Sequence, residues 1–395
     1  MAVPARAKEI ADNTTYLDTG KSHLRFPCLT TEDTMTNKRI VTLTLTQACN
    51  LACAYCYEHH KSDRKMNFSL AKEIIDKQLQ DNSVDEYEFD LFGGEPFLEF
   101  DLVKQITEYI CKNKGEKKCI VFATTNGTLV HGDIQEWLKE HTHCFICGLS
   151  LDGTRDMHNI NRSNSYDDID LDFFATYYPE QDVKMTISEA TLPNLAEGVI
   201  DIHRHNFLVS CNLAYEIDWS NTENENILER ELKKLIDYYI KNPQITPCSM
   251  LGDSIEGIMF DEVNAKRYCG VGKYMVSYDV DGKSYPCQFF MPLSLGEKAS
   301  NSDKLCFPDD TFDINLLDEK CRKCVIRNIC PNCFGANYAA TGNIYKRDSN
   351  MCRLMKIIMR ARSYFKAEQW KNNLLNAEDV QLTIQAILKI QNELN

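Results

Sequence analysis

The sequence predicts an α/β fold in which short strands alternate with helices, followed by a cysteine-rich second domain and C-terminal helices. Two observations predict it. Six short, apolar, β-rich runs alternate with longer segments of helical period between residues 40 and 242. Beyond Pro243 turn residues dominate, and nine of the 18 cysteines lie between Cys248 and Cys352. We therefore expect an N-terminal extension (1–39), a βα domain (40–242), a cysteine-rich domain (243–355) and terminal helices (356–395).

The six runs are expected to form strands, and the clearest helical segments lie between them. The strands are expected at 41–45, 88–92, 119–124, 145–150, 183–187 and 208–214, and the helices at 69–80, 101–112 and 226–241. Ser69 is the expected start of the first helix, whose apolar residues Leu70, Ile74 and Leu79 follow helical spacing. Parallel strands joined by such crossovers close into a barrel or form an open sheet. In both, function collects at the carboxyl ends of the strands.

The second half of the chain predicts shorter elements. We expect short strands at 273–278 and 282–290, and a return to helical period over 354–395. Val380, Ile384, Ile387 and Leu388 would form one apolar face of the last helix. This pattern favours a helix packed on the body of the protein over a helix that binds a partner.

Composition excludes several classes of function. The 395 residues hold 44 Lys plus Arg against 58 Asp plus Glu, a net charge of −14, which repels nucleic acid and anionic membranes. Residues 1–20 lack the apolar region of a signal peptide, and no apolar run reaches the ~18 residues of a membrane span. Without an oxidising compartment, 18 cysteines indicate metal ligands or catalytic groups rather than disulfides.

Three cysteines directly follow the first strand. Cys49, Cys53 and Cys56 lie in TQACNLACAYCY with the spacing C-x3-C-x2-C. Three thiolates on one loop can hold three irons of a 4Fe–4S cluster and leave the fourth iron open. The alternative is a zinc site, for which His59 and His60 are the local candidates for completing the ligand set.

This motif, CNLACAYC after a strand, resembles the radical S-adenosylmethionine (SAM) enzymes, and Tyr55 occupies the aromatic position before the third cysteine. The resemblance implies that SAM chelates the open iron and is cleaved to a 5′-deoxyadenosyl radical, which removes a hydrogen atom from substrate. LFGGEP at 91–96 resembles the GGE motif of the family. There Gly94 would allow close backbone approach, and Glu95 would accept a hydrogen bond from the SAM ammonium.

Further resemblance lies at the ends of later strands. SLDG at 150–153 is followed by Arg162, and in sulfatase-maturing enzymes a Ser and an Arg at this separation contact SAM. Ser150 and Arg162 are therefore expected SAM contacts, the Arg suiting a carboxylate; alone, Arg162 would be read as a surface charge. Leu213 is an expected adenine contact or an ordinary core leucine. TTNG at 124–127 could add polar walls. With the strand count, the resemblance predicts a partial (β/α)6 barrel of radical SAM type.

The downstream cysteines are similar to the seven-cysteine SPASM domain, which carries two auxiliary 4Fe–4S clusters in peptide-modifying radical SAM enzymes. The pattern is Cys269-x12-Gly282-x4-Cys287, then Cys321-x2-Cys324-x5-Cys330-x2-Cys333, then Cys352. The resemblance implies an outer cluster on Cys321, Cys324, Cys330 and Cys352 and an inner cluster on Cys269, Cys287 and Cys333, making three clusters in all. The family commonly has one more residue before Cys333, and the alternative is a zinc ribbon.

The inner cluster is one ligand short, because Val263 stands where full-ligand relatives carry a cysteine. Either Cys248 supplies the fourth thiol or the fourth iron is open. An open iron can bind a substrate thiol, because metal coordination favours thiolate. Sulfatase-maturing relatives place an Asp base directly after the second SPASM cysteine, where this chain has Gln288, which cannot accept a proton. The motif therefore argues against formylglycine formation.

These observations together predict a peptide maturase. It would abstract hydrogen from a ribosomally made precursor peptide with a leader and form a crosslink, foremost a Cys thioether. Carbon–carbon or carbon–nitrogen crosslinking is the alternative; sulfatase maturation, a noncatalytic iron–sulfur redox protein and a zinc-binding module rank below. The expected electron donor is reduced flavodoxin or a ferredoxin, in an anaerobic or microaerobic cytoplasm. Residues 1–39 are too few for a complete winged leader-binding module, and 14–28 form part of a leader surface or a plain extension.

The remaining cysteines have no assigned role. They are Cys28, Cys111, Cys119, Cys144, Cys147, Cys211 and Cys306. Those in or beside strands are expected to pack in the core, where a free cysteine behaves as a small hydrophobe. For Cys144 and Cys147 this interpretation is favoured over a redox pair.

Overall fold

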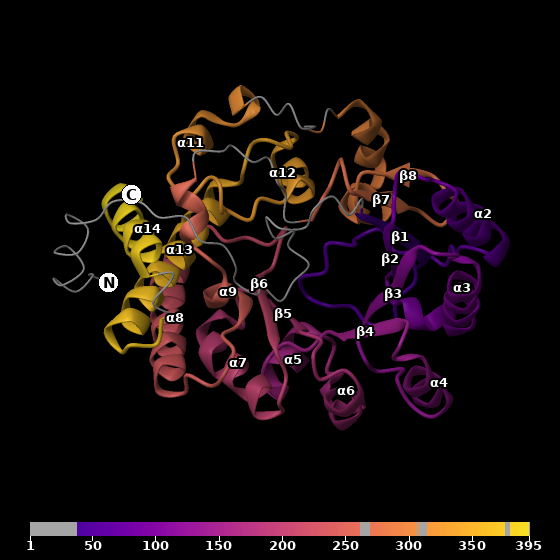
Figure 1. The fold of residues 1–395 in the computed structure, drawn as a ribbon, viewed down its shortest axis with the longest axis horizontal. Coiled ribbons are helices and arrows are strands. Elements are labelled where there is room, and N and C mark those ends of the chain that lie inside the picture. Colours follow the sequence, from indigo (N-terminus) through magenta and orange to yellow (C-terminus); the bar gives the residue numbers. More distant parts are fainter. Residues whose placement is uncertain (1–37, 261–268, 306, 308–313, 376–379, 395) are drawn as a thin grey trace.

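The computed structural model describes residues 38–260, 269–305, 307, 314–375 and 380–394 (Figure 1). The N-terminal stretch 14–28, Val263 and Cys306 lie outside the described residues, and so do the expectations that fall on them. Within the described ranges, no helix is long and apolar enough to cross a membrane.

Six parallel strands form the framework, and all six predicted strands are confirmed. They are β1 (Lys38–Thr46), β2 (Glu86–Gly93), β3 (Lys118–Thr125), β4 (Phe145–Leu149), β5 (Val183–Ile187) and β6 (Val209–Leu213). Strands β1 to β4 pair in parallel in chain order, and β5 pairs with β6. A bridge between Ser150 and Lys184 continues the order from β4 to β5. The carboxyl ends of the strands therefore lie at one edge, as the βα pattern predicts.

Helices cover the outer side of the strands (Figure 1). They are α2 (Phe68–Leu79), α3 (Phe100–Asn113), α4 (Asp133–His141), α5 (Arg155–Asn161), α6 (Leu171–Tyr177), α7 (Leu195–Arg204) and α8 (Glu223–Lys241). Helix α2 begins at Phe68, one residue before the predicted start at Ser69, because the Asn67 side chain accepts a hydrogen bond from the Leu70 amide and caps the helix. Short 3₁₀ helices η1 (Pro96–Glu99), η2 (Tyr166–Asp168) and η3 (Leu192–Asn194) lie in the connections.

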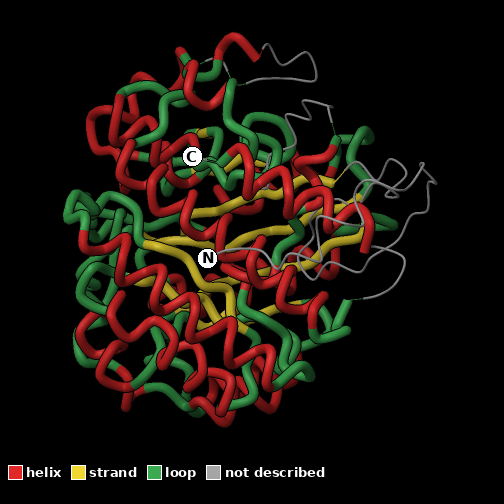
Figure 2. The backbone as a smooth tube through the Cα atoms, turned by 90° about the vertical axis from the view of Figure 1, so that its left-hand side faces the viewer, coloured by secondary structure: helices red, strands yellow, loops and turns green. Residues whose placement is uncertain are grey.

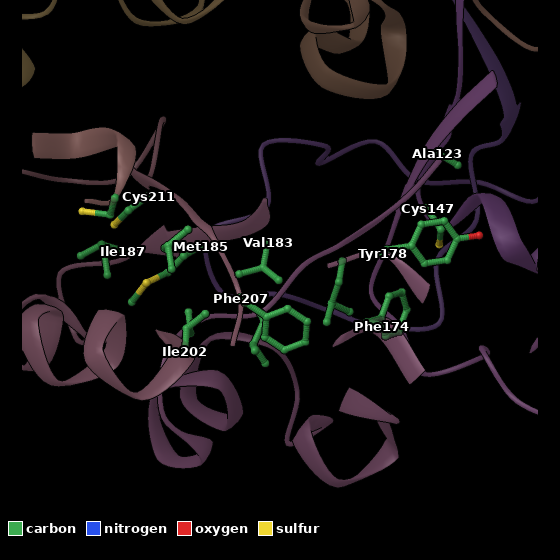
Figure 3. Packing of buried hydrophobic residues seen from close by; sticks show 14 of the residues in the cluster. Ala123, Cys147, Phe174, Tyr178, Val183, Met185, Ile187, Ile202, Phe207 and Cys211 are labelled. Carbon is green, nitrogen blue, oxygen red and sulfur yellow. The ribbon is translucent and has the colours of Figure 1, made fainter. Parts of the chain in front are cut away.

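The main core lies between the strands and these helices. Alternate residues of each strand point to this side, and Val41, Leu43 and Leu45 of β1 are fully buried there. Figure 3 shows Cys147 and Cys211 among the packed apolar side chains of this core. The expected core role of these two cysteines is therefore confirmed. Cys144 is buried as well, in agreement with the packing role expected for it.

The cysteine-rich region adds two strands to the main sheet. Strand β7 (Met275–Tyr278) pairs in parallel with β1, and β8 (Ser284–Tyr285) pairs antiparallel with β7. The expected strand over 282–290 is thus confirmed only at its start. Residues Gln288–Phe290 form the 3₁₀ helix η5 instead, because the chain turns after Cys287. The central position of the strands is visible in Figure 2.

Short helices and two long ones complete the chain. The short ones are α9 (Ser249–Gly252), η4 (Glu256–Met259), α10 (Pro292–Leu295), η6 (Gly296–Lys304), η7 (Ile314–Leu316), α11 (Glu319–Arg322) and α12 (Phe334–Thr341), followed by α13 (Ser349–Lys371) and α14 (Val380–Glu393). Helix α14 buries Ala386, Ile387 and Ile390 in a cluster with Ile255 and Ile258. The expectation that the last helix packs on the body is confirmed.

Candidate active site

The loop after β1 carries the first three cysteines. Cys49, Cys53 and Cys56 are each partly buried. Cys56 lies close enough to the other two for its charge to raise the pKa of both thiols, after the larger effect of burial. The structure therefore brings the three predicted thiols together at the carboxyl end of β1.

The end of β2 holds this loop from one side. The amide of Gly94 donates to the Thr46 carbonyl at 3.1 Å, and the amide of Glu95 donates to the Ala48 carbonyl at 2.9 Å. A Cβ on Gly94 would lie 2.4 Å from the Ala48 carbonyl oxygen and 2.9 Å from the Cβ of Cys49. Glycine is therefore required at 94 for β2 to approach the cysteine loop this closely.

The Glu95 carboxylate is buried at the end of β2 and held in place by β3. Its Oε1 accepts from Thr125 Oγ1 at 2.8 Å and from the Phe97 amide at 3.0 Å, and Oε2 accepts from the Asn126 amide at 2.8 Å. A carboxylate offers about four acceptor positions, so capacity remains for one further cation. The TTNG segment thus orients Glu95, and Asn126 also donates to Asn50 of the cysteine loop.

Arg162 and Tyr55 meet on a buried carboxylate that the sequence analysis did not single out. Oδ2 of Asp152 accepts from Arg162 Nε at 2.9 Å and from Tyr55 Oη at 2.6 Å. The Arg162 guanidinium also lies over the Tyr55 ring, 5.4 Å from its centroid. Burial opposes the charge of Arg162, but Asp152 and then Tyr55 raise its pKa above the usual value. Arg162 is therefore a fixed cation within electrostatic range of Cys53, not a surface charge.

More contacts fix Asp152 itself, which is fully buried. Its Oδ1 accepts from the Thr186 amide at 2.9 Å, and Oδ2 accepts a further hydrogen bond from Asn161 at 3.2 Å. The amide of Asp152 donates to Nδ1 of His158 at 3.3 Å. Burial, and then the nearby Arg162 charge, lowers the pKa of His158 to about 4, so the ring stays neutral and can accept this bond.

The other two predicted SAM contacts lie at strand ends. Ser150 is nearly buried just beyond β4, and its amide donates to the Thr125 carbonyl at 3.0 Å. Leu213 ends β6 and belongs to the apolar core. The roles of Tyr55, Gly94, Glu95, Ser150, Arg162 and Leu213 toward SAM stay predictions.

The sequence analysis also did not single out two ionisable residues that follow the third cysteine. Glu58 is 7% exposed, and burial raises the pKa of its carboxyl to about 8. Lys61 donates to the Leu51 carbonyl at 3.3 Å, and its charge lies within range of Cys49 and Cys56. Their only sequence signal is proximity to the cysteine motif.

The downstream cysteines fall into two groups. One group consists of Cys321, Cys324, Cys330 and Cys352. The charge of Cys330 raises the pKa of Cys321, and the charges of Cys324 and Cys352 raise the pKa of Cys330. Burial and then these neighbours raise the pKa of Cys321 to about 11. Cys269, Cys287 and Cys333 form the other group: burial, then Cys333 and Cys269, raises the pKa of Cys287. The resemblance implies the same two sets as cluster ligands, and that role stays a prediction.

Cys248 lies with a different thiol. It is fully buried, its amide donates to Tyr239 Oη at 2.9 Å, and its thiol lies close enough to Cys211 of β6 for the two to interact electrostatically. Cys248 therefore packs against the barrel core and not with the inner set.

Aromatic side chains lie between the inner set and the first cysteine loop. Tyr57 stacks on Phe289 with ring centroids 4.6 Å apart, and Tyr215 meets the same ring edge-on at 6.3 Å. Burial raises the pKa of Tyr57, and Cys287 and Cys56 both add to the effect. One tyrosine thus reaches both thiol groups. The contact between Tyr57 and Phe289 could not be predicted from the sequence, because it joins segments far apart in the chain.

Two further observations bear on the alternatives. His59 contacts Glu216 at 3.2 Å and His60 lies against Gly296, so neither histidine completes a ligand set with the three cysteines. Across the described ranges, no three His, Cys, Asp or Glu side chains converge closely enough to hold a single metal ion. The zinc interpretations therefore gain no support. The buried Oε1 of Gln288 has no hydrogen-bond partner among the described residues.

Comparison with known sequences assigns the segment that holds the first cysteine motif. Residues 43–170 match the family model of the Radical SAM superfamily. A 111-residue stretch is 36% identical to an uncharacterised protein of Methanocaldococcus jannaschii, and spans 28% of this chain and 37% of that protein. A cysteine-type anaerobic sulfatase-maturating enzyme of Clostridium perfringens is 23% identical over 320 residues, 71% of this chain and 84% of the enzyme.

Two more comparisons extend the likeness. The Bacillus subtilis antilisterial bacteriocin subtilosin biosynthesis protein AlbA is 36% identical over 113 residues, 28% of this chain and 23% of AlbA. The solved structure of native anSMEcpe with bound AdoMet and Cp18Cys peptide has a TM-score of 0.65 and 19% identity, covering 86% of this chain and 100% of that one. At this identity the structural match establishes the fold. The matched segment spans β1 to η2 and carries the three cysteines on one loop, so this protein contains a radical SAM domain at residues 43–170.

Proposed function

We propose that this enzyme is a peptide maturase that crosslinks a ribosomally made precursor, foremost through a Cys thioether. The division of the C-terminal cysteines into a group of four and a group of three carries the proposal. Four thiols complete a 4Fe–4S cluster, whereas three leave one iron without a protein ligand. Together with the first loop, the two groups would hold three clusters.

The residues near the first loop suit SAM. Cys49, Cys53 and Cys56 would hold the cluster, Glu95 retains capacity for the SAM ammonium, and Arg162 offers a buried cation for its carboxylate. When bound, the cluster and SAM supply a 5′-deoxyadenosyl radical that removes a hydrogen atom from the substrate. The network through Asp152 holds Arg162 and Tyr55 in place before SAM arrives.

The inner group suits a substrate thiol. Cys248 packs elsewhere, which supports an open iron over a fourth ligand from that residue. Coordination of a precursor cysteine would favour its thiolate. The product would form one C–S bond and lose one C–H and one S–H bond: a hydrogen atom leaves on 5′-deoxyadenosine, and a proton and one electron leave separately. The auxiliary clusters would supply the acceptor for that electron.

The C. perfringens relative is a sulfatase-maturating enzyme, and one residue argues against that activity here. Gln288 stands where those enzymes are expected to carry an Asp base, and an amide cannot take up a proton. The Cp18Cys peptide bound in the solved neighbour therefore provides a direct control. We expect this protein to leave that peptide unchanged.

The remaining partners belong to the same proposal. The precursor would carry a leader, and electrons would come from reduced flavodoxin or a ferredoxin in an anaerobic or microaerobic cytoplasm. Deletion of residues 1–37 tests whether that segment contributes to leader binding.

The test is mass spectrometry of candidate precursor peptides after anaerobic incubation with SAM and dithionite. A thioether predicts a loss of two hydrogens that disappears when the precursor cysteines are replaced by Ala. Persistence of the loss in the cysteine-free peptide would reject the thioether and favour carbon–carbon or carbon–nitrogen crosslinking. In the enzyme, Cys287→Ala should abolish the product while retaining SAM cleavage, and Cys248→Ala is the matched control that should retain both.

A further inference from the structure

The two downstream cysteine groups are joined by a short link. Cys330 belongs to the group of four and Cys333 to the group of three, and only Pro331 and Asn332 separate them. The resemblance to the SPASM domain leads one to expect one more residue here. A link this short keeps its two end residues close, whatever each thiol binds.

Arg347 clamps one side of this link. Its Nη1 donates to the sulfur of Cys330 at 2.7 Å, and its Nη2 donates to the Pro331 carbonyl at 2.8 Å. The next residue, Asp348, caps α13 by accepting from the Met351 amide at 2.8 Å. Because the planar guanidinium uses two nitrogens on adjacent acceptors, its orientation is fixed.

Asn337 of α12 holds the other side. It is 4% exposed, and its Nδ2 donates to Asn332 Oδ1 at 2.9 Å and to the Ile344 carbonyl at 2.8 Å. Its amide donates to the Cys333 carbonyl at 3.0 Å. The link is therefore held by α12 on one side and by the segment before α13 on the other, and Arg347 brings a positive charge to it.

The charge of Arg347 reaches both cysteine groups. Its guanidinium lies close enough to Cys330 and Cys324 for its positive charge to act on both thiols. It also acts on Cys333 of the other group. Lys356 is a second positive charge near Cys324, and Asp318 is a negative charge near Cys321. Arg347 acts at the shortest range, because it donates a hydrogen bond directly to the sulfur of Cys330.

We propose that Arg347 sets the reduction potential of the cluster held by Cys330 and fixes its distance from the neighbouring group. A reduced cluster carries one more negative charge than an oxidised one, and hydrogen bonds to its sulfurs stabilise that charge. Arg347 is thus a tuning and positioning residue. The inference rests on the proposed assignment of Cys321, Cys324, Cys330 and Cys352 as ligands of one cluster.

The test is a redox titration of the full-length reconstituted protein, followed by electron paramagnetic resonance. In Arg347→Gln, one auxiliary signal should titrate at lower potential. A tenfold change in the one-electron equilibrium corresponds to 59 mV, and we expect a shift of about that size. Arg347→Lys keeps the charge but loses the paired geometry, so its shift should be smaller. Lys346→Gln removes the same charge from the adjacent exposed position and should leave every potential unchanged.

Iron content distinguishes a failure of the role of Arg347 from a failure of the auxiliary-cluster assignment. About twelve irons per chain with an unshifted Arg347→Gln titration, or an equal shift in Lys346→Gln, would overturn the role of Arg347 alone. About four irons in the wild-type protein would instead overturn the auxiliary clusters on which the inference rests. If Arg347→Gln loses iron, Arg347→Lys decides: a lowered potential supports the proposal, and a wild-type potential refutes it.

Discussion

Replacing Asp152 by Asn should disable SAM binding without touching any cysteine. All four side-chain contacts of Asp152 are accepted hydrogen bonds, from Tyr55, Asn161, Arg162 and the Thr186 amide. In either orientation of the Asn amide, its NH₂ group faces donors. The substitution therefore keeps the size of the side chain but places a donor against donors and leaves Arg162 buried without its counter-charge.

The magnitude follows from burial. Asp152 is fully buried and Arg162 is 8% exposed. Removing one partner of a buried ion pair costs about 3 to 5 kcal/mol of folding free energy. If Arg162 also binds the SAM carboxylate, loss of its fixed position removes a charged hydrogen bond of about 1.5 to 3 kcal/mol, or about ten- to hundredfold in affinity.

Urea unfolding and SAM titration calorimetry, both under anaerobic conditions, measure these two quantities. Asp156→Asn is the matched control, because it makes the same change on an exposed carboxylate of the same segment. It should alter neither quantity. Wild-type unfolding and wild-type SAM affinity in Asp152→Asn would refute the positioning role of the network.

Three further predictions follow from single contacts. The pKa of His158 is lowered from 6.5 to about 4, so its contribution to stability is complete above pH 6.5 and is lost as pH falls towards 4. In His158→Gln, the fall in unfolding free energy on acidification from above pH 6.5 to below pH 4 should be smaller by about 3 kcal/mol. A fall of wild-type size would contradict the assignment. Gly94→Ala should lower the iron bound at the first loop, measured by iron analysis, because its Cβ meets the Ala48 carbonyl at 2.4 Å; Gly115→Ala, which meets no atom within 4 Å, should not. Cys287→Ala should lower the total iron and sulfide content, whereas wild-type content in that variant would remove Cys287 from the ligands.

The strands and the first cysteine loop could be predicted because each depends on residues close together in the sequence. The six strands follow from apolar runs of strand length, and the first three thiols meet because they share one short loop. Gly94 and Glu95 could be found because their motif sits at the end of a strand, where parallel strands bring functional groups together.

Contacts between distant segments could not be predicted in this way. Strand β7 pairs with β1, but its own pattern indicates only that it is a strand and not which strand it joins. Tyr57 and Phe289 stack for the same long-range reason. Asp152 lies inside the quoted SLDG motif, yet its role emerges only when α5 and β5 supply its partners.

The sequence also could not decide which thiols group together beyond the resemblance. Cys248 and Cys269 are both cysteines near the start of the second domain. Only packing separates them, because Cys248 is buried beside Cys211 whereas Cys269 is exposed near Cys287.

We propose that Cys49, Cys53 and Cys56 hold the cluster that cleaves SAM and that the downstream cysteines hold two auxiliary clusters. Iron and sulfide analysis combined with a SAM cleavage assay under strict anaerobiosis tests this proposal most directly, with the triple Ala variant of Cys49, Cys53 and Cys56 as the comparison. We predict about twelve irons in the wild-type protein, about eight in the variant, and dithionite-dependent 5′-deoxyadenosine that the variant does not form. Zinc in place of iron, or no 5′-deoxyadenosine from the fully loaded protein, would contradict the account.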